Sequence, residues 1–596
     1  MTTSFIHPAL IMIFGAMLLP FVKEPFRKLY LCSVPILTFI DVIYLSWHPG
    51  VHGVVTFMGD WTLTFGRVDG LSMVFGFIMA LMAIIGTVYG LHVKDNWQHT
   101  AAWFYVAGSL GVIYCGDYLV LFLFWEMMAF ASTFLVWFNT DKGALAAGYR
   151  YLLVHTFGGV VLLLGFVLRY QATGDLSFVQ MDETNTQLYT WLIMAGLMLN
   201  AAVPPLHSWL PDAYSKATIT GAVFMCAFTT KTAIYTLARA FAGFDILIVL
   251  GVIMAIYGII YAMMENDIRR LLGWEIVSQV GYMVAGVGIG TALAINGTCA
   301  HAFAHILYKG LLFMAAGAVV HATGKSKFTE LGGLYKKMPL TLFFMVVGGI
   351  SVSAFPFFSG FVSKSMIISA GFGEHLYTAG FLLTLVSVGT FLVAGLRLPY
   401  LTFFGENRCS EETWTSAKEP PWNMNLAMGA AAFLCFFIGT YPASLYSMLP
   451  NAGVAYHPYS GYHLSETLQI LAFTAVAFMF LKDKLGARDT ISLDLDWFYR
   501  MGGRAFQWLA SVPIQWVDTM WGMAYRVVGL YTLMTTAKFW GWFDWHGIDG
   551  VVDGSARLVR GLGRRVATVF QRGDIQQTIY ISVTFAAVVL ISYVWL

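Results

Sequence analysis

The chain has few charged residues and few cysteines for its length. Only 11% of its 596 residues are charged and 58% are hydrophobic, whereas an ordinary soluble domain has roughly 25% charged residues. A soluble core could not absorb this much apolar surface. The six cysteines are scattered, mostly within apolar segments, and show no CxxC spacing. That pattern argues against an iron–sulfur cluster, a structural zinc site and a disulfide framework.

Three cofactor-binding motifs are also missing. The sequence has no GxGxxG after a strand, no GxxxxGK[ST] phosphate loop and no CxxCH haem signature. We therefore expect no cofactor and no metal in this chain, and we expect any redox centre of its complex to lie in other subunits. The net charge of +2 says little, and we expect no nucleic-acid partner.

Long apolar segments fill almost the whole chain. A helix of about 17 to 25 apolar residues crosses the hydrocarbon core of a bilayer. The sequence therefore predicts an all-α polytopic membrane protein with about sixteen transmembrane helices. The predicted spans are 8–22, 29–46, 70–93, 99–115, 117–138, 149–169, 190–206, 218–240, 245–264, 270–290, 293–320, 340–370, 378–404, 424–447, 464–482 and 577–596. We interpret the first as a retained span, because it lacks the basic region that begins a signal peptide.

The basic residues indicate the orientation. Threading the spans alternately places most of them on one side, namely Lys23, Arg27, Lys28, Lys94, Lys142, Arg150, Lys216, Arg269, Arg270, Lys325, Lys327, Lys336 and Lys337. The other side receives mainly Arg67, Arg169 and Arg239. By the positive-inside rule the first side is cytoplasmic. We expect a bacterial inner-membrane protein with its N-terminus outside and residues 483–576 on the cytoplasmic side.

Two stretches interrupt the apolar helices, LNAAVPPLHSWLPDA (199–213) and SAFPFFSGFVSK (353–364). Broken helices at membrane depth survive only when they are buried in protein or line a wet cavity. Two breaks about 150 residues apart suit an inverted-repeat transporter, although two unrelated proline kinks would give the same pattern. The predicted domains are N-terminal helices (1–98), two five-helix repeats (99–240 and 245–404), additional helices (405–482), a lateral amphipathic segment (483–576) and a C-terminal helix (577–596).

Residues 483–576 differ from the rest, because aromatic and basic residues alternate at roughly helical spacing. This composition favours helices that lie along the membrane interface or on neighbouring helices. Gly502, Gly503, Gly541, Gly547, Gly550 and Gly554 predict that the segment is not one unbroken helix. The alternative is a plain amphipathic connector between two spans.

Ionisable residues near the middle of apolar spans are the main functional signal. Glu126, Lys231 and the trio His301, His305 and Lys309 lie in such places. A charge at the bilayer centre costs several kcal/mol and marks a functional site by default. Burial moves the pKa values of a carboxylate and an ammonium group toward each other. Glu126 and Lys231 are therefore a candidate proton-exchanging pair, although Glu126 alone could be a neutral, hydrogen-bonded residue.

His301, His305 and Lys309 are spaced at i, i+4 and i+8, so they share one helix face over about 12 Å. Imidazole titrates near neutral pH and can pass a proton from one ring nitrogen to the other. The trio therefore predicts a proton wire. Metal ligation by the two histidines is the alternative, but the ammonium group of Lys309 disfavours it.

Further candidates lie near the helix breaks and span ends. Lys364 follows the second break, so we expect it to reach a cavity from the freed turn. Glu275 lies near the cytoplasmic end of its span and is an accessory candidate. For Asp69 and Asp117, at span ends, a capping or solvated role is favoured over transport.

Seven motifs together resemble the antiporter-like membrane subunits of respiratory complex I, membrane-bound hydrogenases and Mrp-type cation/proton antiporters. They are VDGLSMVF (68–75), GDYLVLFLFWE (116–126), PLHSWLPDAYSKA (205–217), NDIRRLLGWEIVSQVGYM (266–283), HAFAHILYKGLLFMAAGAV (301–319), FPFFSGFVSKS (355–365) and LRLPYLTFFG (396–405). EIVSQVGYM is similar to the Mrp D-type subunit. The long segment before the last span resembles the lateral helix of the distal complex I subunit.

The resemblance implies roles for single residues. Glu126 takes the place of the family's key glutamate, His301, His305 and Lys309 that of the central proton wire, and Lys364 that of the terminal acceptor lysine. Lys231 resembles a secondary lysine. The family's principal first-half lysine precedes the Pro-x-His-type stretch, which contains His207, and here that place falls on Asn200, which cannot titrate. The first-half switch is therefore either rebuilt around Lys231 or lost.

We therefore expect a proton-translocating subunit, with antiport of another cation such as sodium as an option, that works beside other membrane subunits in the lipid bilayer. Two alternatives stay open on the sequence alone. One is a membrane subunit of a quinone- or ferredoxin-linked dehydrogenase or hydrogenase. The other is the energy-coupling partner of an inorganic-carbon transporter.

Overall fold

The computed structural model describes residues 5–59, 61–489, 493–570 and 573–595. The chain divides into two compact units, Met1–Asp496 and Trp497–Leu596. The division falls inside the predicted 483–576 segment, and the other predicted domain boundaries stay predictions. Each unit is described by itself.

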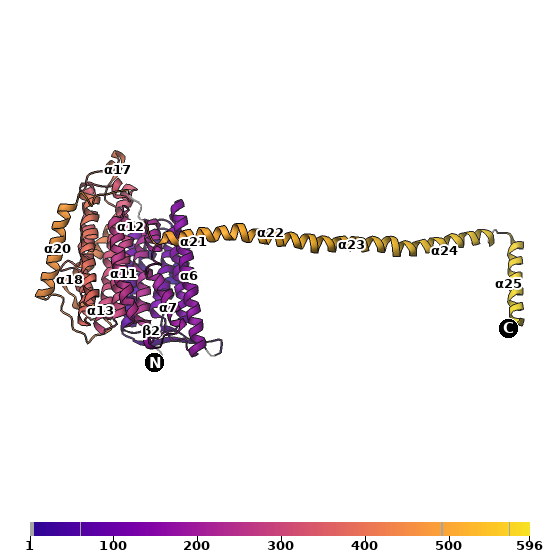
Figure 1. The fold of residues 1–596 in the computed structure, drawn as a ribbon, viewed down its shortest axis with the longest axis horizontal. Coiled ribbons are helices and arrows are strands. Elements are labelled where there is room, and N and C mark those ends of the chain that lie inside the picture. Colours follow the sequence, from indigo (N-terminus) through magenta and orange to yellow (C-terminus); the bar gives the residue numbers. More distant parts are fainter. Residues whose placement is uncertain (1–4, 60, 490–492, 571–572, 596) are drawn as a thin grey trace. The chain divides into compact units, whose positions relative to one another are not determined.

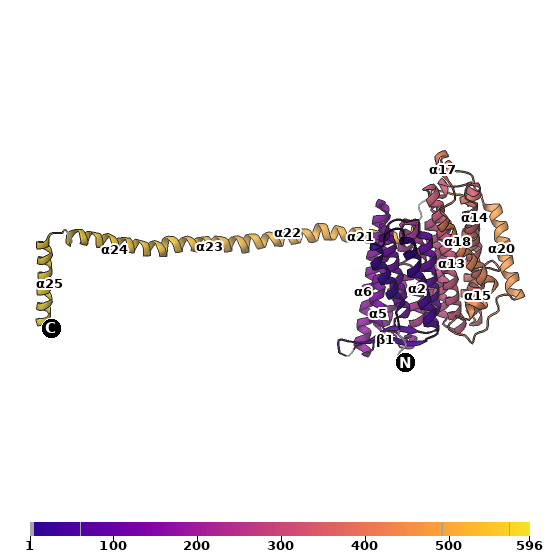
Figure 2. The same cartoon turned by 180° about the vertical axis from the view of Figure 1, so that it is seen from behind.

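The first unit is a bundle of roughly parallel and antiparallel helices (Figures 1 and 2). Its first half contains α1 (Pro8–Leu18), α2 (Arg27–Ser46), α3 (Gly70–Gly90), α4 (Asn96–Tyr114), α5 (Tyr118–Trp137), α6 (Lys142–Thr173), α7 (Leu188–Asn200), α8 (Trp209–Lys216), α9 (Ile219–Ala227) and α10 (Thr229–Ala240). Its second half contains α11 (Asp245–Met264), α12 (Ile268–Ile289), α13 (Ala292–Thr323), α14 (Pro339–Val352), α15 (Ser359–Gly373), α16 (Tyr377–Thr390), α17 (Glu411–Ser416), α18 (Trp422–Thr440), α19 (Ala443–Tyr446) and α20 (Gly461–Leu481).

Eleven of the described helices are long and apolar enough to cross a membrane. The all-α polytopic fold is therefore confirmed, while the count of sixteen spans stays a prediction. Helix α16 continues as π-helical turns at Phe391–Arg397 and Tyr400–Phe404. The predicted span 378–404 therefore runs on as one helical stretch.

One element of the first unit was not expected. Strands β1 (Gly50–Phe57) and β2 (Trp61–Val68) form an antiparallel hairpin between α2 and α3. Helices α3 and α5 begin at this end of the bundle, which we call the hairpin end (Figure 1). Their first turns are capped by Asp69 and Asp117, which accept backbone N–H groups as helix-capping carboxylates do. The capping role predicted for both aspartates is confirmed.

Three helical stretches of the bundle are interrupted. The breaks between α7 and α8 and between α14 and α15 fall within the two predicted stretches, and Ala202 and Ala354 adopt positive φ there. A third break, at Phe228 between α9 and α10, was not predicted. The sequence gives no signal for it, because CAFTTKT has neither proline nor glycine.

The two halves of the bundle correspond at an offset of 150 residues. Helices α6 and α13 begin at Lys142 and Ala292, and each has 32 residues. The isolated β-bridges Asp117–Ser177 and Asp267–Lys327 flank them at the same offset. Helix α5 begins at the hairpin end, whereas α12 begins at the opposite end. Two repeats of inverted topology would give this correspondence.

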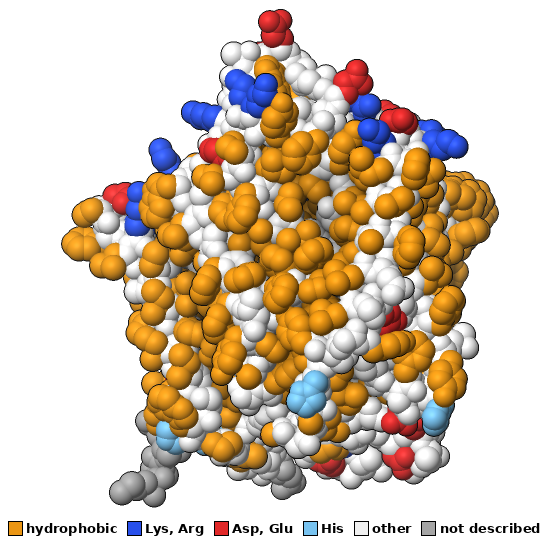
Figure 3. Space-filling model, turned by 90° about the vertical axis from the view of Figure 1, so that its left-hand side faces the viewer, with side chains coloured by type: hydrophobic (Ala, Val, Ile, Leu, Met, Phe, Trp, Pro, Cys, Tyr) orange, Lys and Arg blue, Asp and Glu red, His pale blue; other side chains and the backbone are white. Residues whose placement is uncertain are grey.

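The surface of the first unit is that of a membrane protein. Figure 3 shows hydrophobic side chains over the middle of one face, with lysine and arginine gathered near its upper edge. The exposed large apolar side chains of this unit include Phe433 and Phe473. Exposed apolar area on this scale is rare in a soluble monomer and is typical of a lipid-facing surface.

The second unit contains most of a long helical run. The run comprises α21 (Asp496–Leu509), α22 (Gln515–Ala524), α23 (Thr532–Phe543) and α24 (Asp549–Phe570), joined by π-helical turns. The prediction that the glycines break this segment was wrong. Glycine destabilises an exposed helix by only about 1 kcal/mol per residue. The chain therefore stays helical through these glycines and through the π-helical turns. Helix α25 (Ile575–Trp595) is the last apolar helix.

Candidate functional site

A buried ion pair lies at the centre of the first unit. The ammonium group of Lys309 on α13 donates a hydrogen bond to the carboxylate of Glu275 on α12, and neither side chain is exposed. A buried charge needs a partner of opposite sign, because desolvation costs several kcal/mol per ion. Glu275 therefore moves from an accessory candidate to the direct partner of Lys309.

The two histidines of α13 continue from this pair along one helix face. Both are fully buried, with ring centroids 6.2 Å apart. Neither ring nitrogen of His305 has a hydrogen-bonding partner among the described protein atoms. His301 Nδ1 lies 3.2 Å from the hydroxyl of Ser363 on α15. The predicted shared face of the trio is therefore confirmed, and Ser363 connects it to the next helix.

Lys364 follows Ser363 and lies beside the second helix break. Its ammonium group donates to the carbonyl oxygen of Val352, at the end of α14, at 3.0 Å and lies 5.0 Å from the ring centroid of Tyr282. The break thus supplies a free carbonyl that holds the lysine, because the last carbonyls of a helix have no partner within it.

A cavity of about 360 Å³ opens beside Lys364. It lies between α15, α16 and α20, and Ser353 and Ala354 of the break line it. Residues from Tyr456 to Tyr462, at the hairpin end, and Glu466 of α20 also belong to its lining. The expectation that Lys364 reaches a cavity from the freed turn is therefore confirmed.

Lys231 lies on α10, directly after the unpredicted break. Its ammonium group donates to the carbonyl oxygen of Cys226 at 2.6 Å, and the side chain is fully buried. Its charge lies within interaction range of Lys309 and His305. The position of Lys231 therefore connects it with the relay of the second half.

Glu126 does not pair with Lys231 in the described part of the chain. Its carboxylate is partly buried, and Oε1 has no hydrogen-bonding partner among the described atoms. A Cβ atom added to Gly159 on α6 would lie 1.9 Å from this oxygen. Glu126 therefore faces the backbone of α6 at a position that only glycine leaves open.

The offset of 150 residues relates the surroundings of Glu126 to the trio on α13. Adding 150 to Tyr151, His155 and Gly159 leads to His301, His305 and Lys309, at matching positions of α6 and α13. The first half thus has a carboxylate, Glu126, and a histidine, His155. Gly159 stands where the second half has Lys309. His155 is buried, with its ring centroid 4.5 Å from that of Trp209. Sequence reasoning missed His155, although its place within an apolar span was the signal used for the other histidines.

Asn200 lies at the last position of α7, before the break, and is fully buried. Its side chain lies close to that of His155, but neither makes a well-formed hydrogen bond with described atoms. The structure therefore brings Asn200, His155 and the break together.

His207, in the loop between α7 and α8, is fully buried, and Nε2 lies 3.2 Å from Asp494 Oδ1. Tyr257 on α11 donates to the same oxygen at 2.5 Å. Burial raises the pKa of Asp494, but hydrogen bonds and charge from His207, with hydrogen bonds from Tyr257 and the Leu495 N–H, outweigh it and lower that pKa. His207 is thus an anchor for the segment that precedes α21.

Among the described residues, no group of three or more His, Cys, Asp and Glu side chains is placed to bind a metal ion. The buried polar groups instead form a line of ionisable side chains from Glu275 and Lys309 to His305, His301 and Lys364. Such a line can carry protons by successive hydrogen-bond exchange.

Comparison with known proteins agrees with this geometry. Residues 115–392 match the family described as NADH:quinone oxidoreductase/Mrp antiporter, transmembrane. This part of the chain is similar to that family's transmembrane domain. The match includes every candidate of the relay, from Glu126 to Lys364, and confirms the resemblance found in the motifs.

Two relatives come from a Na⁺/H⁺ antiporter of Alkalihalophilus pseudofirmus. The A-type subunit is 29% identical over 500 residues, which cover 74% of this chain and 62% of the relative. The D-type subunit is 28% identical over 441 residues, which cover 69% of this chain and 89% of the relative. The chain thus spans less than two thirds of the A-type relative.

Two solved structures share the fold. A chain of the Mrp complex from Dietzia sp. DQ12-45-1b aligns with a TM-score of 0.67 at 20% identity, covering 80% of this chain and 98% of that one. A chain of the membrane-bound sulfane sulfur reductase, an archaeal respiratory membrane complex, aligns with a TM-score of 0.65 at 23% identity, covering 78% and 97%.

Proposed function

We propose that this protein is a proton-translocating subunit of a multisubunit membrane complex. The observation that carries the proposal is the buried Lys309–Glu275 pair, which lies in line with two buried histidines and a lysine beside a cavity. Burying five ionisable groups has a high energetic cost. Proton transfer explains why a packed membrane bundle keeps them.

The proposed route begins at Glu275 and Lys309, passes along His305 and His301, and crosses at Ser363 to Lys364. From Lys364 the proton enters the cavity, whose lining also carries the titratable side chains of His457, His463 and Glu466. Each group can accept a proton on one side and donate it on the other. Lys231 influences this route through its charge.

The assignment to a complex and the orientation belong to the same proposal. The two similar sequences are named as subunits of Na⁺/H⁺ antiporters, which supports other membrane subunits as partners and sodium as a second ion. The lysine-rich end of the bundle would face the cytoplasm of a bacterial cell, with the segment before α21 on that side, and the hairpin end would face outside.

Purification of the native complex through a tag on this chain tests the proposal. The complex would be reconstituted in sealed vesicles, and proton movement would be followed with a pH-sensitive dye, with and without a sodium gradient. We expect proton movement that depends on this chain, and a response to the sodium gradient if the complex is an antiporter. An intact complex that moves no protons under either its redox substrate or an ion gradient would contradict the proposal.

A further inference from the structure

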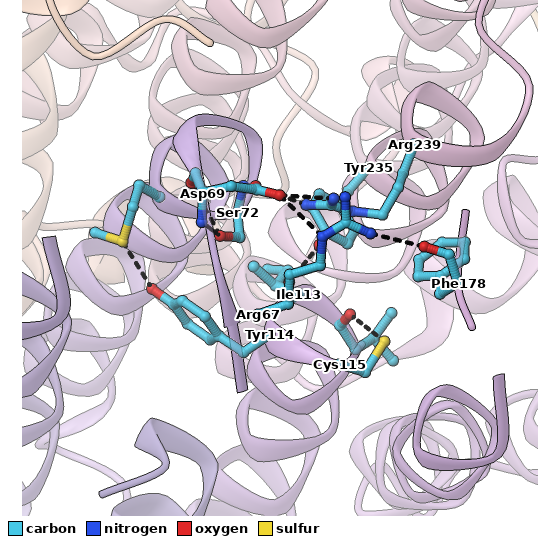
Figure 4. A network of polar contacts seen from close by, with 11 residues as sticks. Arg67, Asp69, Ser72, Ile113, Tyr114, Cys115, Phe178, Tyr235 and Arg239 are labelled. Carbon is cyan, nitrogen blue, oxygen red and sulfur yellow. Dashed lines mark hydrogen bonds and ion pairs between the residues drawn. The ribbon is translucent and has the colours of Figure 1, made fainter. Parts of the chain in front are cut away.

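A second charged cluster lies at the hairpin end, outside the proposed relay. Arg239 on α10 donates two hydrogen bonds to the carboxylate of Asp69, at 2.7 and 2.8 Å. Arg67 on β2 donates to the same carboxylate at 3.1 Å. Figure 4 shows the Asp69 carboxylate facing both guanidinium groups. A bidentate arginine–carboxylate pair has fixed geometry and is among the strongest charge-assisted contacts.

Asp69 stays ionised in this setting. Burial acts to raise the pKa of its carboxyl, but hydrogen bonds and charge from Arg239, with the Ser72 N–H and the charge of Arg67, lower that pKa to about 2. The pair is thus charged across the physiological range of pH.

The cluster forms the end of a polar line on α10. Lys231, Tyr235 and Arg239 are spaced at i, i+4 and i+8, so they share one face over about 12 Å. Arg239 Nε donates to the hydroxyl of Tyr235 at 2.9 Å, and this hydroxyl donates to the carbonyl oxygen of Ile113 on α4. The line runs from mid-bundle at Lys231 to the hairpin end at Arg239.

Packing as well as charge keeps water away from this line. Lys231 and Tyr235 are fully buried, and Arg239 is 7% exposed. The ring of Phe75 on α3 lies edge-on to that of Tyr235 at 5.5 Å. Lys364, by contrast, lines a cavity whose lining extends to Tyr456 and Tyr462 at the same end of the bundle. The two lysines thus differ in access to the hairpin end.

We propose that the Asp69–Arg239 ion pair is a gate that closes the hairpin end of the polar line from Lys231. The inference rests on the proposed translocating function. While the pair is formed, protons exchange with the hairpin side through the Lys364 cavity only. When the pair opens, Tyr235 loses its donor and the line to Lys231 becomes accessible to water.

Asp69→Asn in the native complex is the direct test. Asparagine caps helices about as well as aspartate, and its side-chain oxygen can still accept from the Ser72 N–H, so the start of α3 is kept while the ion pair is lost. We expect normal assembly and a several-fold rise in passive proton leak through sealed vesicles. Adding Lys231→Met to this variant should return the leak to the level of the wild type.

Asp175→Asn is the matched control. Asp175 accepts from the buried Arg169 at 2.9 Å near the end of α6, at the hairpin end, and Arg169 and Asp175 do not belong to α10. This change removes an ion pair of similar exposure, so it should leave the leak unchanged. An equal leak in both variants would show that loosening this end of the bundle is enough, and the gate would be rejected.

Cys115 provides a readout that does not depend on transport. Its thiol is fully buried near the cluster (Figure 4) and lies within interaction range of Arg239. In a background with Cys32→Ser and Cys409→Ser, which removes the two partly exposed cysteines, a membrane-impermeant maleimide should label Cys115 in Asp69→Asn and not in the parent.

The two measurements separate the gate from the proposed function. A parent complex that translocates protons, with an Asp69→Asn variant that shows neither leak nor labelling, would overturn the gate alone. An intact parent complex that moves no protons would overturn the proposed function, whatever the variant does.

Discussion

Lys309 and Glu275 form a hydrogen-bonded ion pair in which neither side chain is exposed, although 34 residues separate them in the chain. Removing one member of such a pair leaves an unpaired buried charge, whereas replacing both by apolar residues often does not destabilise a protein. Stability and transport should therefore respond differently to single and double changes.

Glu275→Gln should stop transport and destabilise the bundle. The amide cannot exchange a proton, and the Lys309 ammonium group loses its counter-charge, which typically costs about 3–5 kcal/mol. Thermal unfolding of the purified complex and proton uptake by vesicles measure the two effects. The double change Glu275→Met with Lys309→Met should recover much of the stability and none of the transport. Transport by the double variant would contradict a role for this pair in the relay.

We expect Lys231 to affect proton transport through the relay of the second half. Its ammonium group binds the Cys226 carbonyl oxygen and lies in range of Lys309 and His305, whereas Asn200 lies near His155. We expect Lys231→Met to reduce proton transport strongly and Asn200→Lys to restore none of it in that background. Glu126→Gln, measured in parallel, should assemble normally and report separately on the first half. Rescue by Asn200→Lys would show that Glu126 and Lys231 act as a pair after all.

Much of this arrangement could be predicted from the sequence. Apolar length predicted the helices, and proline and glycine predicted two of the three breaks. Helical spacing also placed His301, His305 and Lys309 on one face. These are local signals, because each depends on residues within a few turns of one another.

The remaining features depend on tertiary contacts. Glu275 meets Lys309 only because α12 and α13 pack side by side. The break at Phe228 has no proline or glycine that would predict it. The strands β1 and β2 lie between two predicted spans, where the sequence predicted only a loop. The role of Gly159 becomes visible only when α6 and α13 are compared at the offset of 150 residues.

Blocking the cavity should slow proton transfer without touching Lys364. Ser369 lines the cavity one helical turn beyond Ser365, so Ser369→Trp would place a large apolar side chain in the path. We expect a large loss of transport rate in vesicles at normal assembly. Ser447→Trp, at an exposed position of the hairpin end, is the control and should transport normally. An unblocked rate in Ser369→Trp would argue for another exit.

The anchor at Asp494 should depend on pH in a defined direction. The pKa of Asp494 is lowered in the folded protein, so its contribution to stability is present above the ordinary value of about 3.9 and is lost as pH falls through the lower, folded-state value. His207→Gln should raise that pKa and shift the loss to higher pH. Hydrogen exchange of the peptide 482–496, corrected for intrinsic rates, measures this shift.

The control for that experiment is Lys327→Gln, which breaks the 3.9 Å contact with Asp489, where the side chains are 51% and 79% exposed. Such exposed pairs contribute little, so its exchange profile should match that of the wild type. Identical profiles for His207→Gln and the wild type would remove His207 from the anchor.

The most direct test of the account is the rate of proton translocation by the complex with Lys364→Met in sealed vesicles. Lys364 is the last buried group before the cavity, and methionine keeps the length of the side chain without a transferable proton. A positioned proton donor contributes roughly 10²-fold or more to a transfer step, so we predict a loss of about that size with unchanged assembly. Translocation near the wild-type rate, at a normal level of assembled complex, would contradict a relay that ends at Lys364.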